Sequence, residues 1–343
     1  MKMICGITLC QLLCCTAVSA QDFGPWSSPA NQGSTLNSTC DDQHPALSKD
    51  GLSLVFSSTR PLTPGVSCLP ALHLWVAQRD SLDSPWQAPQ PLSAVNSPYN
   101  STYEDHAPNL TTDGHWLFFH STRPGECNPA GGRRELWVAH RQNKRDDFGW
   151  QPPLNLGCIL NWTGVDDAGP NFWEDNSTGT LYLYFTRNLT PTDPNGFKIH
   201  VSTCTSDLAS CNRQQLWSPA EYVTELNFVG ARDTRTAIRR RDGLEMIISS
   251  NRTSAIGGLD LWVANRASAQ DLWSIPLNLN QDNSDKCTAE GNSNCPVINS
   301  TVNDSAPAFS WDGQTLIFWS NRAGGLGFND LYVITREKLT ERQ

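Results

Sequence analysis

The sequence has little positive charge. Lys and Arg number 25 against 34 Asp and Glu, which gives a net charge of −9 and a pI near 5.2. Because nucleic-acid binders need a basic face, this balance excludes a nucleic-acid partner. Basic residues do cluster at Arg133-Arg134 and at Arg239-Arg240-Arg241. We interpret the triple, which lies beside a turn, as a solvated edge.

Beyond residue 20 the sequence lacks any apolar run of the roughly 18 residues that a membrane span needs. The first twenty residues combine Lys2, an apolar run from Ile4 to Val18 and small residues up to Ala20. This pattern is typical of a secretory signal peptide rather than of a retained anchor. We therefore predict a signal peptide over 1–20 and a single secreted domain over 21–343, monomeric and without a membrane span.

Tight Cys-x-x-Cys pairs are absent from the predicted mature chain, which argues against a metal site built on sulfur. Four of the twelve cysteines leave with the signal peptide, and an even number in an exported chain favours disulfides. From their positions in the repeat described below we expect four bridges. These are Cys40–Cys68, Cys127–Cys158, Cys204–Cys211 and Cys287–Cys295.

Several catalytic motifs are also missing. The chain has no Gly-x-Ser-x-Gly elbow, no His-Glu-x-x-His and no phosphate-binding loop. It is instead rich in Asn-x-Ser/Thr sequons, which favours a glycosylated secreted protein. The sequon asparagines are Asn37, Asn100, Asn109, Asn161, Asn176, Asn188, Asn251, Asn299 and Asn303.

An internal repeat determines the fold class. Each copy has a turn, usually Asp-Gly, then alternating apolar residues, then an arginine. The arginines are Arg60, Arg123, Arg187, Arg252 and Arg322, separated by 63, 64, 65 and 70 residues. The third copy is irregular, because Asn176–Gly179 replaces the Asp-Gly turn.

Each copy carries four short strand-like runs without a helical segment between them. The fourth begins with tryptophan and usually a nearby proline, which suits an outer edge strand. Four antiparallel strands per copy and five copies predict an all-β, five-bladed β-propeller. The last copy stops after its third strand, and the segment with Trp26 and Pro29 matches the missing fourth strand. We expect this segment to close the ring, a permutation that a β-sandwich would not explain.

The strings Ser310–Gly313, Phe318–Arg322 and Asp260–Ala264 resemble the WD-like propeller repeats of the TolB family. The similarity covers essentially the whole predicted mature chain and implies the propeller fold. Propellers of that family with more blades serve as protein-docking modules or as caps on peptidases. The chain contains no such partner domain.

The loops entering each first strand should gather at one mouth of the channel, together with most of the cysteines. An acidic residue recurs there in every copy, and two imidazoles and two guanidiniums break the repeat beside it. The candidate ligand-binding residues are Asp42, His44, Asp105, His106, Asp167, Arg232, Asp233, Arg235 and Asp304. Such a mouth suits a glycan, a small polar ligand or a divalent cation such as calcium.

Two functions remain open on this evidence. The first is an extracellular binding module that recognises a glycan, a small polar ligand or a protein. The alternative is a secreted glycosidase-like enzyme that uses the repeated carboxylates, because glycoside hydrolysis needs a paired acid and base. A structural interpretation competes with both, since a repeated Asp and a repeated Arg can form one ion pair per blade. The burial of each Asp against its own arginine distinguishes these alternatives.

Overall fold

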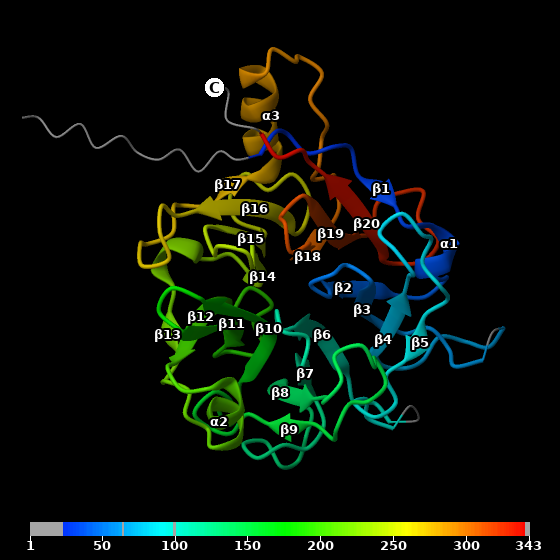
Figure 1. The fold of residues 1–343 in the computed structure, drawn as a ribbon, viewed down its shortest axis with the longest axis vertical. Helices are drawn as coiled ribbons and strands as arrows, with labels where there is room; N and C mark the ends of the chain where they lie inside the picture. The colour runs from blue at the N-terminus through cyan, green and yellow to red at the C-terminus, as the bar shows by residue number, and fades with distance from the viewer. Residues whose placement is uncertain (1–22, 64, 99–100, 340–343) are drawn as a thin grey trace, which may run out of the picture.

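Five four-stranded antiparallel sheets surround one axis, which confirms the predicted five-bladed propeller (Figure 1). The computed structural model describes residues 23–63, 65–98 and 101–339, so the predicted signal peptide lies outside the described residues. Successive first strands contact one another around the axis and close the ring. No helix in the described part of the chain is long and apolar enough to cross a membrane.

The blades follow one another along the chain. Blade 1 is β2 (Asp42–Leu47), β3 (Ser53–Ser58), β4 (His73–Gln78) and β5 (Gln90–Pro91). Blade 2 is β6 (Asp105–Leu110), β7 (Trp116–Ser121), β8 (Glu135–His140) and β9 (Leu154–Asn155). Blade 3 is β10 (Asp166–Asp175), β11 (Thr180–Asn188), β12 (Phe197–Cys204) and β13 (Glu221–Tyr222). Blade 4 is β14 (Asp233–Ile238), β15 (Glu245–Ser250), β16 (Asp260–Asn265) and β17 (Leu277–Asn278). Blade 5 is β18 (Asp304–Phe309), β19 (Thr315–Ser320), β20 (Asp330–Thr335) and β1 (Ala30–Asn31).

The outer strand of every blade begins four residues after a tryptophan. In four blades an arginine that follows the third strand stacks on this tryptophan, with guanidinium-to-ring distances of 4.1–4.5 Å. Its Nε also donates to the carbonyl oxygen of the glycine in the first hairpin turn, at 2.7–2.9 Å. These arginines are Arg79, Arg141, Arg266 and Arg336. Each one therefore ties the outer edge of its blade to the first hairpin.

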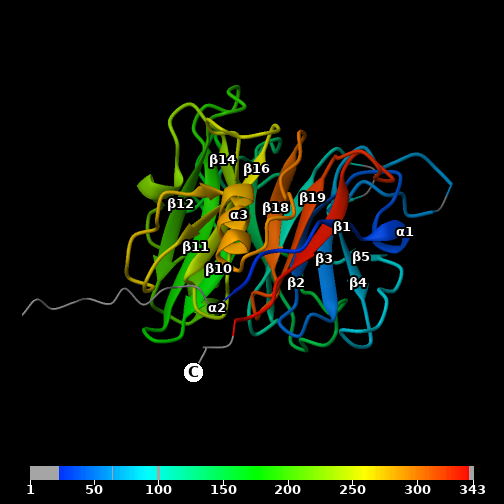
Figure 2. The same ribbon diagram turned by 90° about the horizontal axis from the view of Figure 1, so that it is seen from above.

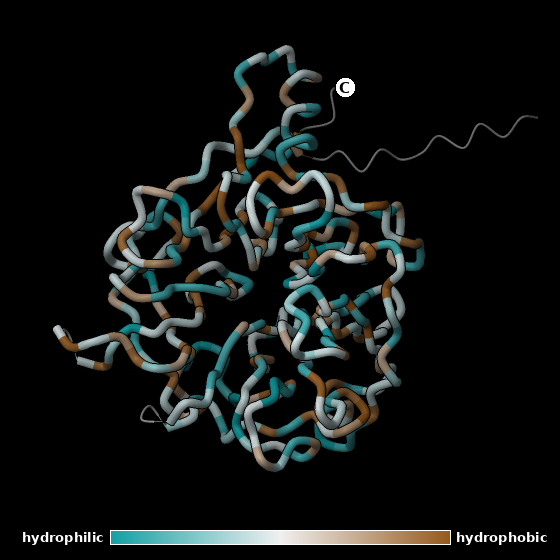
Figure 3. The backbone as a smooth tube through the Cα atoms, turned by 180° about the vertical axis from the view of Figure 1, so that it is seen from behind, coloured by the Kyte–Doolittle hydropathy of each residue, from teal (hydrophilic) through white to brown (hydrophobic). Residues whose placement is uncertain are grey.

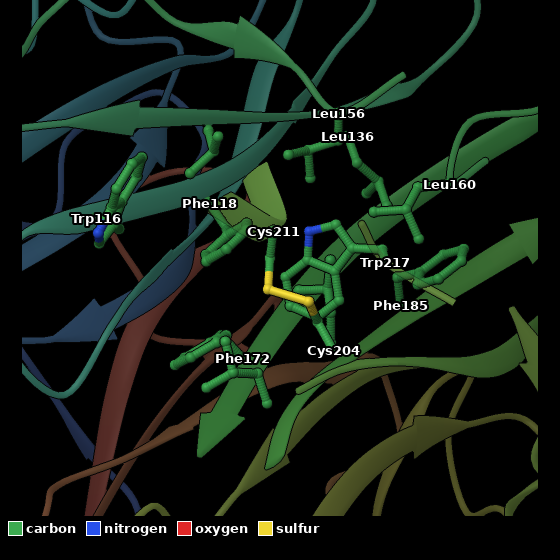
Figure 4. Packing of buried hydrophobic residues seen from close by; sticks show 13 residues of the cluster. Trp116, Phe118, Leu136, Leu156, Leu160, Phe172, Phe185, Cys204, Cys211 and Trp217 are labelled. Carbon is green, nitrogen blue, oxygen red and sulfur yellow. A yellow bond between two sulfur atoms is a disulfide. The ribbon is translucent and has the colours of Figure 1, made fainter. Parts of the chain in front are cut away.

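Blade 3 replaces this arginine with a disulfide. Cys204, at the end of β12, is bonded to Cys211 in helix α2 (Leu208–Arg213). Trp217 packs in the same apolar cluster as this disulfide (Figure 4). Its indole N–H donates to the side-chain oxygen of Asn212 at 3.1 Å. In the irregular third copy, a disulfide thus takes the place of the arginine–tryptophan contact that holds the outer edge of the other blades.

The N-terminal segment completes blade 5, as predicted. Ala30 and Asn31 pair with Val333 and Tyr332 of β20, where the outer strand of this blade belongs. Trp26 is buried, and its backbone N–H donates to the amide oxygen of Asn283 in helix α3 (Leu279–Ala289) at 2.5 Å. The ring is therefore closed by strand pairing and by a helix that holds the entering segment.

A buried ion cluster supports this closure. Glu245 accepts from Arg336 at 2.6 and 2.8 Å and from Arg239 at 2.7 Å, and the Arg336 guanidinium stacks on Phe23 and Trp26. Although burial acts in the opposite direction, Arg336 and then Arg239 hold the pKa of Glu245 below its ordinary value. The solvated edge predicted for the arginine triple is therefore wrong for Arg239, which joins blade 4 to the closing segment.

Replacing Trp26 by alanine is expected to lower the free energy of unfolding by about 3–5 kcal/mol, because a fully buried indole leaves a cavity and Arg336 loses its ring partner. Urea denaturation followed by fluorescence measures this loss. Ile275→Ala is the matched control, since Ile275 is 83% exposed. Equal stability of the two variants would contradict a closing role for the segment.

Three of the four predicted disulfides form: Cys40–Cys68, Cys127–Cys158 and Cys204–Cys211. The fourth prediction is wrong in this structure, where Cys287 and Cys295 are thiols. Burial, and then a hydrogen bond with Cys295, raise the pKa of Cys287 to about 11. Helix α3 and the segment after it, which carry these thiols, protrude from the ring (Figures 1 and 3), and α3 lies on the near side in the view from above (Figure 2). The described structure therefore holds this insertion by packing against the N-terminal segment rather than by a covalent bond.

The asparagines of three sequons stabilise the blades through hydrogen bonds. Each side-chain amide accepts from the N–H, and donates to the carbonyl, of one leucine in the third strand of its blade. These asparagines are Asn37, Asn161 and Asn299. Asn188 is also buried, and its side-chain N–H donates to the carbonyl of Asp193. The prediction that these four carry glycans is wrong, because their amide nitrogens are buried and already bonded. The sequons at Asn109, Asn176, Asn251 and Asn303 stay predictions, and Asn100 lies outside the described residues.

Candidate functional site

The repeated aspartates are the first feature of the channel mouth. Each one is fully buried and accepts from the arginine of its own repeat. The pairs are Asp42–Arg60, Asp105–Arg123, Asp167–Arg187, Asp233–Arg252 and Asp304–Arg322. The same arginine also donates to a main-chain carbonyl in the segment that precedes the blade. The five carboxylates are thus committed to one structural bond network per blade.

This geometry corrects the interpretation of these aspartates as ligand-binding or catalytic groups. A carboxylate with no exposed surface and an arginine on one oxygen cannot reach a substrate. At Asp167, which accepts from Arg187 Nε at 2.6 Å, burial outweighs Arg187 and raises the pKa of the carboxyl to about 6. A functional site must therefore use the residues that break the repeat.

A bulge in every first strand directs one residue to the channel, the third residue of the strand in four blades and the fourth in β10. The register is broken at this point in all five blades, and the residue has a positive φ of 51–60°. The five residues are His44, Ala107, Gly169, Arg235 and Ala306, and all line the channel cavity. Because three of them have a methyl group or less, the channel has room for the imidazole and the guanidinium of the other two.

Three imidazoles lie together beside the channel. His106 Nε2 and His44 Nδ1 are 2.7 Å apart, and the rings of His106 and His120 have centroids 5.0 Å apart. His44, His106 and His120 are buried. Burial is the largest cause that holds all three pKa values well below 6.5, and the positive charge of Arg235 acts in the same direction. All three rings are therefore neutral at pH 7.

His120 was not among the predicted site residues. Its Nδ1 accepts the N–H of Gly169 in the next blade at 3.3 Å. At the equivalent places, Ser57 and Ser249 accept from Ala107 and Ala306. A signal for His120 was present in the sequence, because its position is a hydroxyl residue in three other blades, Ser57, Thr186 and Ser249, and Trp319 in the fifth, so the repeat does not require an imidazole there.

Arg235 is the unpaired cation of the site. The residue is 9% exposed, its buried Nη1 has no hydrogen-bond partner, and no ion pair in the described part of the chain engages it. It lies against Gly169, where an added Cβ would be 2.6 Å from Nη1. Burial, followed by the like charges of Arg232 and Arg134, lowers its pKa well below the ordinary value for arginine.

Two further arginines, Arg232 and Arg134, form the rim of the mouth beside Arg235. Arg232 stacks on Phe197 at 5.0 Å and has a buried Nε without a hydrogen-bond partner. Arg134 lies between Glu104 at 3.5 Å and Asp166 at 3.6 Å, and its Nε also lacks a partner. Three guanidiniums against two carboxylates leave a charge of +1 at this mouth, on a chain whose net charge is −9. The mouth is therefore a local attractor for anions.

The other end of the channel is blocked. Arg240, the second member of the arginine triple, donates to the carbonyls of Leu110 at 3.0 Å and Leu47 at 2.8 Å. Burial lowers its pKa to about 10, and the predicted solvated edge is wrong for this residue too. The channel cavity has a volume of about 40 Å³, enough for ordered water and too small for a sugar ring. A ligand would therefore approach from the opposite end, which we call the His–Arg mouth after His44, His106, Arg134, Arg232 and Arg235.

The predicted candidates thus separate into two groups. The structure brings His44, His106, Arg232 and Arg235 together, whereas the five aspartates lie in separate ion pairs. Within the described ranges no group of three or more His, Cys, Asp or Glu side chains is arranged to hold a metal ion. The guanidiniums at this mouth are also unfavourable neighbours for the calcium ion considered above.

No family model matches the chain, and no curated protein matches it in sequence. Its fold is similar to solved glycoside hydrolases. A thermostable family-43 glycoside hydrolase has a TM-score of 0.52 at 13% identity, over 89% of this chain and 91% of that one. An α-L-arabinofuranosidase from Lactobacillus brevis has a TM-score of 0.52 at 12% identity, over 88% and 92%. The family-117 hydrolase Zg3597 from Zobellia galactanivorans has a TM-score of 0.51 at 10% identity, over 92% and 91%.

The resemblance to TolB-type repeats is therefore wrong as a family assignment. The short strings that suggested it, such as Ser310–Gly313, encode a hairpin turn and an adjacent strand that propeller blades in general require. At 10–13% identity the solved structures show the fold of this chain, a five-bladed propeller of the kind that glycoside hydrolases use.

Proposed function

We propose that the protein is a secreted, carbohydrate-active propeller that holds an acidic saccharide at the His–Arg mouth. The observation that carries the proposal is Arg235, an unpaired guanidinium nine-tenths buried at the end of the channel. A buried charge without a counter-charge is unfavourable, and a bound carboxylate would remove that cost. Arginine also suits this ligand, because its planar fork binds a carboxylate through two parallel hydrogen bonds.

The surroundings favour an anion over a neutral sugar. Arg232 and Arg134 add positive charge at the rim. The rings of Trp162 and Phe197 already stack on arginines, so they are not free to stack on a neutral sugar. The solved propellers with this fold include glycoside hydrolases, which supports a carbohydrate as the ligand and the enzyme alternative over a passive module. Three disulfides support secretion.

The test compares binding of oligogalacturonate with binding of the same oligosaccharide fully methyl-esterified, by calorimetry. We expect the acid to bind and the ester, which has no carboxylate charge, to bind far more weakly. Affinity for the acid should fall with added salt, because the rim charges are screened.

Replacing Arg235 by glutamine should weaken binding of the acid about 10- to 150-fold, which corresponds to about 1.5–3 kcal/mol for a hydrogen bond to a charged group. Arg213→Gln is the matched control, since Arg213 is exposed on helix α2 at the outer edge of blade 3. Equal affinity for acid and ester, or an Arg235 variant that binds like the control, would contradict an anionic ligand at this mouth.

A further inference from the structure

Trp311 is another residue that breaks the repeat. The residue before the Asp-Gly turn is Lys49, Thr112 and Arg241 in blades 1, 2 and 4, and Trp311 in blade 5. The turn itself does not require an aromatic ring, because three other residue types occupy the same place. Trp311 is only half-buried in the folded chain. A tryptophan that the turn does not need, and whose ring is partly open to solvent, is a candidate for contact with a ligand.

Two hollows meet at Trp311, on the face of the ring that the first hairpin turns form. This face is at the end opposite to the His–Arg mouth. One hollow, of about 480 Å³, lies between blades 5 and 1, and the other, of about 670 Å³, lies mainly between blades 1 and 2. Each volume is within the range of small-molecule sites, about 300–1,000 Å³. The two hollows share a wall formed by Lys49, Asp50, Arg79 and Trp311. A ligand that fills both hollows must therefore cross this wall.

The shared wall includes a lysine that stacks on the indole. Lys49 Nζ lies 4.4 Å from the centroid of the Trp311 ring, and Lys49 forms no ion pair within the described residues. Lys49 is exposed, and lysine has a flexible four-carbon stem. Its ammonium can therefore turn from the indole to a hydroxyl group of a ligand. The wall thus offers both an aromatic ring for stacking and an N–H donor beside it.

The turn aspartates of three blades add hydrogen-bond acceptors to the two hollows. In each of these turns, Oδ1 of the aspartate accepts both a hydroxyl and a backbone N–H of its own turn. The second oxygen, Oδ2, accepts no hydrogen bond in the part of the chain that the structure describes. These exposed aspartates are Asp50, Asp113 and Asp312. Each carboxylate is therefore held in place by its turn and has one oxygen available to a ligand.

The charges along the two hollows are balanced. Five cations and four carboxylates line them, and one of the cations, Arg141, is paired with Asp147 at 2.5 Å. The cations are Lys49, Arg79, Arg141, Lys144 and Arg145, and the carboxylates are those of Asp50, Asp80, Asp113 and Asp312. Unlike the His–Arg mouth, these hollows do not favour an anion. Donors and acceptors side by side suit a neutral polyol, because every hydroxyl group both donates and accepts.

We propose that the hairpin face carries a second saccharide site, for a neutral oligosaccharide that crosses the Lys49–Trp311 wall. One sugar ring stacks on the indole through its C–H groups. Hydroxyl groups of the neighbouring rings donate to the turn aspartates and accept from Lys49. The site uses no residue of the His–Arg mouth, so neither site depends on the other.

A protein partner fits this face less well. The centre of a protein–protein interface is usually apolar and depleted of charged residues. Here the shared wall places Lys49, Asp50 and Arg79 at the centre, beside the indole. Among the described residues that line the hollows, Leu82 is the one large apolar side chain that is exposed, at 62%. The face therefore lacks the continuous apolar patch that would mark a protein-docking surface.

The experiment titrates the mature protein with cellohexaose, arabinohexaose and laminarihexaose by calorimetry. We expect at least one of these neutral chains to bind, with an affinity that added salt changes little, because the ligand has no charge to be screened. The disaccharide of the same series should bind more weakly, since it cannot occupy both hollows. If none of the three chains binds, the proposal is overturned.

Trp311→Ala is expected to weaken binding of the hexasaccharide about 5- to 30-fold, the usual effect of truncating an aromatic anchor. Trp311→Phe keeps an aromatic ring and should retain most of the affinity. Phe328→Ala is the matched control, since Phe328 is 73% exposed in the loop between β19 and β20, at the mouth end of blade 5. Urea denaturation of the Trp311→Ala protein shows whether the variant is folded, and we expect its stability to be close to that of the control.

The outcomes separate the hairpin-face site from the acidic-saccharide site. An excess of oligogalacturonate should leave binding of the neutral hexasaccharide unchanged. Displacement would place both ligands at one site and overturn the second site. A folded Trp311→Ala protein that binds the hexasaccharide as tightly as the Phe328→Ala control would also overturn it. Neutral binding that depends on Trp311 supports the second site even where oligogalacturonate does not bind, a result that contradicts the proposed function alone.

Discussion

Asp233→Asn is expected to lower the free energy of unfolding by about 3–5 kcal/mol, the usual cost of removing one partner of a buried ion pair. Asp233 has no exposed surface and accepts from Arg252 at 2.6 Å, with Lys198 at 3.2 Å. The asparagine keeps the shape of the side chain and removes its charge. Arg252, which is 5% exposed, would then have no counter-charge. Chemical denaturation of the two proteins measures the difference.

The same variant tests the role of the repeat. If Asp233 is structural, saccharide binding should decrease only to the extent that the folded fraction does. Asp271→Asn is the control for a carboxylate on the surface, because Asp271 is exposed in the loop between β16 and β17. A stable Asp233 variant that has lost its activity would show instead that the carboxylate is catalytic.

The ring itself could be predicted from the sequence because its determinants are local and repeated. The turns, Asp-Gly in four of the five copies, and the alternating apolar residues lie within about ten residues of each other in each copy. The closing segment was recognisable for the same reason, since Trp26 precedes its strand by the same four residues as the other blade tryptophans.

The misinterpreted residues are those whose partners are distant in the sequence. Arg240 seals the channel through the carbonyls of Leu47 and Leu110, which are 193 and 130 residues away. The residues that follow Asn37 make it a sequon. Its side-chain amide, however, is hydrogen-bonded to the main chain of Leu331, 294 residues later. Neither contact has a local signature, so composition and motif favoured the more common interpretation.

The candidate site was found only in part, and for a definite physical reason. A repeated residue in a propeller occupies the same environment five times, and Asp42 and its equivalents are explained by that environment alone. The residues that break the repeat are not. His44, His106 and Arg235 were identified by this criterion, and His120 satisfies it too.

Lowering the pH from 6.5 to 5 is expected to destabilise the protein steeply. His44, His106 and His120 have pKa values well below 6.5 in the fold, whereas in the unfolded chain they return to about 6.5. Below that pH the unfolded state binds protons that the native state does not, so the free energy of unfolding falls with the pH. Each histidine contributes up to about 1.4 kcal/mol per pH unit, or about 4 kcal/mol for the three.

Other groups, among them Asp167 and His200, modify this slope. The pKa of Asp167 is raised to about 6, so below that pH the native state takes up a proton at Asp167 before the unfolded state does. This uptake offsets the contribution of about one histidine to the slope. Burial also lowers the pKa of His200 on β12, which adds to the slope in the same direction as the axial three. Denaturation curves at half-unit pH steps measure the sum. A His44, His106 and His120 triple glutamine variant should lose most of the dependence above pH 6, where Asp167 contributes little. If the triple variant kept the full slope, the pKa values of the axial imidazoles would be the same in the native and unfolded states, and burial at the channel would not disfavour their protonation.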